Sequence, residues 1–208
     1  MKNKKIMALV ISIVLGLAFS GCSQDRTSAA DPDCQAGSSI STQDVEDAGN
    51  KPADTSSDGT AGKKVAKDGA DMQTDDKAMP TRKLPENGTR INMHFGDTVI
   101  PGVLNDSDTA KALIEKLPVT VHMSRYSHDF CGSAGDLDLP YNEDEVHYGW
   151  LNGDIDYAID APWFTILFED EDSSEKYGYQ VNIGVIDCPL EKISSLEGSY
   201  DVLVELAE

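Results

Sequence analysis

Apolar and polar side chains alternate repeatedly in residues 88–208, and this period of two constrains the fold more than any other feature of the chain. Successive side chains of a β-strand point to opposite faces, so each alternating run predicts a strand with one dry and one wet face. In one run, Ile155 and Tyr157 are predicted to lie inside, and Asp154 and Asp156 in water. The predicted strands lie at residues 91–95, 98–104, 119–123, 155–159, 164–168, 181–185 and 202–206.

A helical period appears in residues 107–117, where apolar residues recur at i, i+3, i+4 and i+7 from Ala110. Ser107 and Asp108 are suitable capping residues at its start, and Pro118 ends it. A shorter helical turn is expected at residues 190–196. These elements predict a mostly-β domain, in which about seven or eight mostly antiparallel strands form a small closed barrel with one or two capping helices.

Several motifs of this domain follow one another in an order that resembles bacterial cyclophilin-like domains. They are the hairpin 91–104, the helix ending in Leu117-Pro118, and the segments 149–157, 163–168 and 182–186. The resemblance implies a cyclophilin-like barrel. Prolyl isomerases of the cyclophilin type carry the strings Phe-His-Arg and Gly-Ser-Gln-Phe-Phe, and neither occurs here. No catalytic residue is therefore carried over, and the resemblance predicts a fold without an activity.

The chain begins with the features of a secretory signal. Residues 1–5 are basic, residues 6–19 are almost wholly apolar, and Ser20-Gly21 precede Cys22. A cysteine in this place resembles the bacterial lipobox, in which the thiol receives a diacylglycerol. We therefore expect residues 1–22 to be a lipoprotein signal peptide and Cys22 to anchor the mature protein at the extracytoplasmic face of a bacterial membrane. An ordinary signal peptide with an incidental cysteine is the alternative.

Residues 23–87 are predicted to form a disordered polar tether, because they hold no aromatic residue and their few apolar residues show no period. The negative charge lies mainly beyond them. Residues 88–208 hold 6 basic and 24 acidic residues, and the whole chain has a net charge of −20. Such a surface repels phosphate backbones and anionic headgroups, so we expect no nucleic-acid partner and attachment to the membrane through the lipid alone.

Two cysteines of the domain, Cys131 and Cys188, are predicted to form a disulfide, since thiols tend to oxidise outside the cytoplasm. Two unpaired buried thiols are the alternative. Cys34 is then left in the tether as an odd thiol.

No metal site or cofactor is predicted. The residues His122 and His128, with an aspartate, would suit zinc chemically, but their spacing matches no ligand motif, so surface histidines are favoured. The acidic runs 142–145 and 169–172 lack the pattern of a calcium loop, so solvated loops are expected.

Aromatic residues at strand ends and in loops supply the remaining functional signal, since such residues are enriched in recognition grooves. An arginine beside them would bind a carboxylate or a carbonyl group. The alternative is simple packing of the barrel mouths. The candidate groove consists of Arg125, Tyr126, Phe130, Trp150 and Trp163.

Three classes of function remain open on these grounds. The first is a non-enzymatic binding module that holds a peptide or a small molecule. The second is a prolyl isomerase-like folding factor, and the third is a surface protein that binds divalent cations. The absence of catalytic motifs favours the first class.

Overall fold

The computed structural model describes residues 64–73 and 75–208. The signal peptide, Cys22 and the predicted tether up to residue 63 lie outside these residues, so those expectations stay predictions. Among the described residues, no helix is both long and apolar enough to cross a bilayer.

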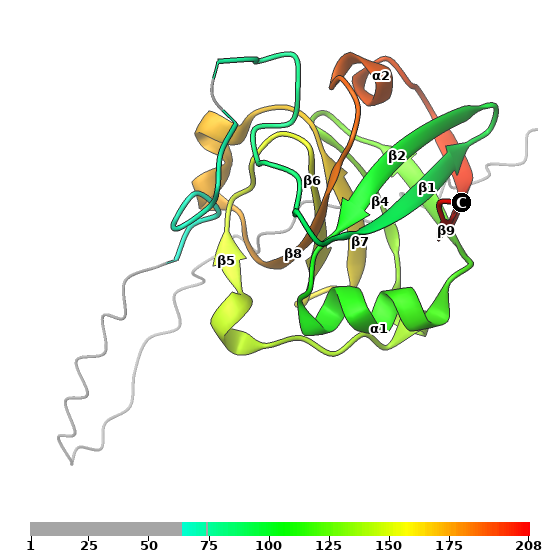
Figure 1. Ribbon diagram of the computed structural model, residues 1–208, viewed down its shortest axis with the longest axis horizontal. Coiled ribbons are helices and arrows are strands. Elements are labelled where there is room, and N and C mark those ends of the chain that lie inside the picture. The colour runs from blue at the N-terminus through cyan, green and yellow to red at the C-terminus, as the bar shows by residue number, and fades with distance from the viewer. Residues whose placement is uncertain (1–63, 74) are drawn as a thin grey trace, which may run out of the picture. The chain divides into compact units, whose positions relative to one another are not determined.

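Within the described part of the chain, nine strands form one antiparallel sheet (Figure 1). The sheet order is β2-β1-β9-β3-β4-β7-β6-β8-β5. A further pairing between β2 and β8 closes eight of these strands into a barrel, and the short β5 extends along β8. The predicted closed barrel is confirmed. The strands are β1 Thr89–Phe95, β2 Thr98–Leu104, β3 Val119–Arg125, β4 Asp129–Ser133, β5 His147–Tyr148, β6 Asp154–Ala158, β7 Trp163–Leu167, β8 Gly178–Ile186 and β9 Ser199–Leu206.

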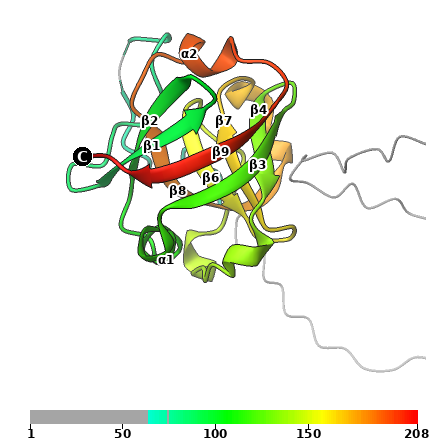
Figure 2. The same cartoon turned by 90° about the vertical axis from the view of Figure 1, so that its right-hand side faces the viewer.

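Helices α1 (Asp108–Lys116) and α2 (Glu191–Ser194) lie at opposite ends of the barrel (Figures 1 and 2). Ser107 caps α1 as expected, because its hydroxyl accepts a hydrogen bond of 3.1 Å from the Ala110 amide. Leu113 of α1 and Ile193 of α2 are fully buried in the core. Three 3₁₀ helices complete the fold, η1 Gly135–Leu137, η2 Glu143–Glu145 and η3 Glu171–Lys176.

The sequence missed two strands, β4 and β5. Strand β4 reads Asp-Phe-Cys-Gly-Ser and contains few residues that favour a strand. It forms because β3 and β7 pair with it on its two sides. Strand β5 has only two residues, too few for an alternating pattern to be visible.

The described residues between 64 and 87, here called the cover segment, lie against the barrel and do not belong to a tether (Figure 1). Val65 forms a parallel bridge with Tyr148 of β5. The Thr81 amide donates a hydrogen bond of 2.7 Å to the Asn152 carbonyl, and the Leu190 amide donates one of 2.8 Å to the Ala78 carbonyl. The predicted boundary at residue 87 is therefore wrong, because this polar segment satisfies its backbone groups on the barrel without needing a core of its own.

A close approach of two backbones fixes the middle of the cover segment. Gly153 has a φ of 98°, a conformation that glycine adopts readily. A Cβ atom at this position would collide with Pro80, which is itself buried. Only glycine thus lets the turn before β6 fit under the cover segment.

Because the cover segment lies over β6, the predicted wet face of this strand is dry. Asp154 and Asp156 are both fully buried. Arg82 of the cover segment donates to the two carboxylate oxygens of Asp154, from Nε at 2.8 Å and from Nη2 at 2.9 Å. The alternation correctly separated the two faces of β6, but it did not show that an arginine from outside the barrel covers the polar one.

The predicted disulfide between Cys131 and Cys188 is wrong. Cys131 is disulfide-bonded, but Cys188 is a free, buried thiol, so the two are not joined to each other. Cys188 packs in the barrel core with Phe130. Cys131 directly follows Phe130 on β4, so its side chain points to the other face of the sheet. Cys34 lies outside the described residues.

The ion pair between Arg82 and Asp154 generates the first prediction. Replacement of Arg82 by Met leaves the buried Asp154 carboxylate without its counter-charge and should cost about 3–5 kcal/mol of unfolding free energy. Combining it with Asp154→Asn should cost clearly less than the sum of the single changes, since the two groups act as a pair. Urea unfolding of the four proteins measures this coupling.

Lys83→Met is the matched control, because the neighbouring Lys83 forms an ion pair with Asp71 in which both side chains are exposed. This replacement should cost less than about 1 kcal/mol. Equal losses for the Arg82 and Lys83 variants would show that the buried ion pair does not fasten the cover segment.

Candidate functional site

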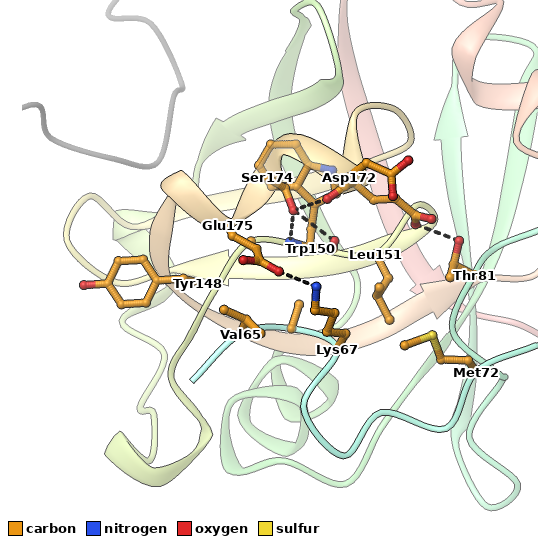
Figure 3. A pocket seen from close by; sticks show the side chains of 13 residues that line it. Val65, Lys67, Met72, Thr81, Tyr148, Trp150, Leu151, Asp172, Ser174 and Glu175 are labelled. Atoms are coloured by element: carbon orange, nitrogen blue, oxygen red, sulfur yellow. Dashed lines mark hydrogen bonds and ion pairs between the residues drawn. The ribbon is translucent and has the colours of Figure 1, made fainter. Parts of the chain in front are cut away.

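The cover segment encloses two neighbouring cavities against the barrel. The first, here called the aromatic cavity, has a volume of about 210 Å³ and lies between the cover segment, the residues after β5 and helix η3 (Figure 3). The second, here called the polar cavity, has a volume of about 220 Å³ and lies between the cover segment, β5 and the start of α1. Val65 and Ala66 line both cavities.

Trp150 lines the aromatic cavity, and its ring is firmly held by its neighbours. Its ring is stacked on His128 with a centroid distance of 4.8 Å, and on Tyr177 with a distance of 5.5 Å. Its indole N–H donates a hydrogen bond of 2.8 Å to the Glu169 carbonyl, and its amide donates one of 3.0 Å to the buried Ser174 hydroxyl. These contacts hold the ring in one orientation before any ligand arrives.

The opposite wall of the aromatic cavity comes from the cover segment. Val65 and Met72 present apolar side chains here, and Leu151 lies across from them (Figure 3). Lys67 and Glu175 form an exposed ion pair at the rim. The cavity is therefore apolar in its walls and charged at its mouth, as small-molecule sites often are.

Glu171 connects the cover segment to helix η3 beside this cavity. Its Oε2 atom accepts hydrogen bonds of 2.7 Å from the Thr81 hydroxyl and from the Asn152 amide. The acidic run 169–172 was expected to be a solvated loop, and its other members, Glu169, Asp170 and Asp172, are exposed. Glu171 is half-buried, because it joins two segments distant in sequence.

His147 of β5 lines the polar cavity and is buried. Its Nδ1 atom lies 3.1 Å from the Gly149 carbonyl, which can only accept, so Nδ1 carries the proton. Nε2 is then an acceptor, and this buried atom has no hydrogen-bond partner. Burial lowers the pKa of His147 to about 4, and the Arg82 charge adds to this effect. The ring is therefore neutral at physiological pH.

Behind the polar cavity lies a network of buried polar side chains. Burial alone would lower the pKa of Arg82, but the hydrogen bond and the charge of Asp154 outweigh this and raise it. Burial, together with the Asp154 charge, raises the pKa of Asp156 well above its usual value. Asn182 of β8 donates a hydrogen bond of 2.9 Å to Asp156 Oδ1. The network thus holds a charged Arg82–Asp154 pair beside an Asp156 carboxyl that resists ionisation.

The five residues of the predicted groove do not line one cavity. Phe130 is fully buried in the barrel core. Trp163 is paired with Ser133 at one end of β4, whereas Arg125 is paired with Phe130 at the other end. Of the five, Trp150 lines the aromatic cavity, and none of the others lines either cavity.

Arg125 and Tyr126 are occupied by contacts within the domain. The Arg125 guanidinium lies 4.8 Å from the centroid of the Phe168 ring, and its side chain is largely buried. The Tyr126 amide donates a hydrogen bond of 2.8 Å to the Asp129 carbonyl. These contacts favour the alternative interpretation, in which both residues pack at the end of the barrel, over a role in a ligand groove.

The four histidines divide into two pairs. His94 and His122 lie on the outer faces of their strands and pair with Glu205 and Asp201 at 2.9 and 2.8 Å. His147 and His128 are buried, so the expected surface position of His128 is wrong. In the described residues, no three His, Cys, Asp or Glu side chains gather closely enough to hold a metal ion.

Comparison with known proteins agrees with this architecture. Residues 93–205 match the model of the cyclophilin-like family. This match covers more than half of the chain, and the protein belongs to the cyclophilin-like family. The solution structure of the hypothetical protein AF2241 from Archaeoglobus fulgidus is similar at a TM-score of 0.47 and 20% sequence identity, over 59% of this chain and 98% of that chain. No curated protein matches the chain.

Sequence reasoning missed the residues that define the polar cavity. Arg82 was hidden in a segment with the composition of a disordered tether, and His147 follows an acidic run without any recognised motif. The one available signal was the pair Asp154 and Asp156 on β6, together with Gln180 and Asn182 on β8, of which Asn182 is paired with Asp156. Such a concentration of polar residues on paired strands is consistent with a buried network as well as with a wet face.

The raised pKa of Asp156 generates the second prediction. The folded protein retains this proton to a higher pH than the unfolded chain, so the contribution of Asp156 to stability falls as the pH rises from about 4 towards its folded pKa. The loss approaches at most ~1.4 kcal/mol per pH unit in this window. Asp156→Asn should remove this pH-dependent loss, so the free energy of unfolding of the variant should rise relative to that of the parent between pH 5 and pH 8.

Urea unfolding at several pH values measures this difference. His147 changes stability in the opposite direction, since its lowered pKa costs stability as the pH falls from about 6.5 to about 4. The comparison of variant with parent cancels this contribution. Asp160→Asn, an exposed change just after the same strand, is the control and should leave the pH profile unchanged. If the stability of Asp156→Asn changed with pH in parallel with that of the parent, the prediction would be wrong.

Proposed function

We propose that this protein is a binding module of the extracytoplasmic bacterial surface, held at the membrane by a lipid on Cys22. The aromatic cavity takes an apolar group of a peptide or small molecule, and the module performs no catalysis. The observation that supports this best is a cavity lined by the firmly held Trp150, by Leu151 and by apolar side chains of the cover segment. A wall that is already ordered costs little conformational entropy when a ligand binds.

The charge at the cavity mouth supports selection among ligands. Glu171, Asp172 and Glu175 contribute carboxylates to its lining, and Lys67 contributes the single ammonium group. A neutral or cationic ligand with an apolar group suits this rim better than an anion does. The predicted peptide or small-molecule ligand therefore remains the favoured partner, at a different place from the predicted groove.

Arg125 gives no support to the isomerase alternative. A cyclophilin-type isomerase needs an arginine that faces its substrate in an apolar groove. The Arg125 guanidinium lies over Phe168 of this chain, with Nε 3.8 Å from Glu197. The calcium-binding alternative has no observation in its favour.

The lipid anchor generates the third prediction. Cys22→Ala removes the thiol that would carry the lipid, and the strongly acidic domain has no attraction to anionic headgroups. The variant, expressed with its signal peptide, should appear in the soluble extracytoplasmic fraction while the parent stays with membranes. Cys34→Ala is the matched control and should stay membrane-bound. A Cys22→Ala protein that remained with the membrane would contradict the anchor.

Ligand binding in the aromatic cavity generates the fourth prediction. The protein has two tryptophans, and Trp163 lies outside the cavity, so Trp163→Phe leaves Trp150 as a single reporter. After incorporation of 5-fluorotryptophan, N-acetyl-phenylalanine amide should shift the ¹⁹F resonance of Trp150 in a saturable manner. The neutral amide models an apolar side chain within a peptide.

Two methionines of the cover segment supply a matched pair of variants. Both are half-buried, but Met72 lines the aromatic cavity and Met79 does not. Met72→Asp should weaken the binding at least about tenfold, since a carboxylate replaces an apolar wall, and Met79→Asp should not. An absent shift, or equal weakening by both variants, would rule out this cavity as the ligand site.

A further inference from the structure

Two side chains that line the polar cavity each have a buried acceptor atom for which the described residues provide no donor. His147 Nε2 is buried and has no hydrogen-bond partner, and the same is true of Glu145 Oε2. Both residues line the cavity. Buried polar atoms without partners are rare, because each loses its hydrogen bonds to water and gains none in return. Two of them at one cavity indicate a ligand that supplies the missing donors.

The orientation of His147 defines what Nε2 can bind. The Gly149 carbonyl holds the proton on Nδ1, and Gln180 Nε2 donates to the same carbonyl at 2.6 Å. The ring is thus held by a carbonyl that is itself fixed, and its Nε2 lone pair is left to accept a hydrogen bond from an N–H or O–H group.

The polar side chains with N–H groups around the cavity each donate within the fold. Arg82 donates to Asp154, and Lys64 Nζ donates a hydrogen bond of 2.7 Å to the Asp144 carbonyl. Asn105 Nδ2 donates to the Asn182 carbonyl at 2.8 Å, and Asn182 Nδ2 donates to Asp156. The lining therefore offers acceptors to a ligand.

The charged side chains that line the polar cavity also favour a cationic ligand. Three carboxylates line the polar cavity, those of Asp68, Asp106 and Glu145. The two cationic side chains of the lining, Lys64 and Arg82, are occupied as described above. The domain as a whole is strongly acidic, which raises the local concentration of small cations.

We propose that the polar cavity is a binding site for the primary ammonium group of a small molecule, which donates N–H groups to His147 Nε2 and to the Glu145 carboxylate. A primary ammonium group carries three N–H donors and one positive charge, so it satisfies both acceptors at once. The volume of about 220 Å³ suits a small amine. The site does not depend on use of the aromatic cavity.

The test uses the full mature protein with ¹⁵N-labelled histidine at pH 7.5. Without ligand, His147 should show a protonated Nδ1 and an unprotonated Nε2. Addition of ethanolamine should move the Nε2 resonance in a saturable manner. Tetramethylammonium has the same charge but no N–H group, and it should leave the resonance in place. Equal shifts by the two cations would mean that charge alone acts, and would overturn the proposal.

Helix η2 supplies a matched pair of variants for the carboxylate. Glu145 lines the cavity, whereas Glu143 in the same helix is exposed and does not. Glu145→Gln should weaken ethanolamine binding at least about tenfold, and Glu143→Gln should leave it unchanged. Both are isosteric changes outside the barrel core, so the thermal midpoints should stay close to that of the parent. Equal affinities of the two variants would overturn the proposed role of Glu145.

Two further titrations distinguish the source of the ammonium group and the class of ligand. Vesicles containing phosphatidylethanolamine should not move the Nε2 resonance if the site takes free amines, because a cavity of about 220 Å³ does not admit a bilayer surface. Titration with zinc chloride tests whether the site binds a metal ion instead of an amine. A shift with zinc or with the vesicles, and none with ethanolamine, would overturn the assignment to a small amine.

Discussion

The buried ion pair between Arg82 and Asp154 is the interaction on which both cavities depend. It brings a charged residue of a polar segment onto a strand of the barrel, and each partner compensates the loss of hydration of the other. Without it, the cover segment would retain its backbone hydrogen bonds, the hydrogen bond from Thr81 to Glu171 and an exposed ion pair. Both cavities have walls from this segment, so both require it to stay in place.

The sequence allowed the barrel to be predicted well, because its strands each bury one face. The run from Val181 to Val185 alternates apolar and polar side chains, and it lies within strand β8. The assignment of the opposite face to water failed for Asp154 and Asp156, since alternation shows only that two faces differ. Whether the polar face is wet depends on a segment about 70 residues away, and composition gave that segment no reason to order itself.

The candidate site was less accessible to such reasoning. Trp150 was singled out for a ligand groove because aromatic residues near strand ends are conspicuous, and it lines the aromatic cavity. Phe130 was grouped with it on the same basis and Arg125 as a neighbouring cation, but the register of β3 with β4 turns both to packing within the barrel. His147 and Glu145 belong to no recognised motif. That their acceptor atoms are buried without a donor is visible only in the folded structure.

The attachment of the cover segment has a mechanical consequence. A pull on the chain ahead of residue 64 is transmitted first to the bridge between Val65 and Tyr148, and only later to Arg82 and the barrel strands. The segment would peel from its beginning while the closed sheet stayed intact. Since Val65 and Ala66 form a shared wall, tension on this end of the chain would act on both cavities at the same step.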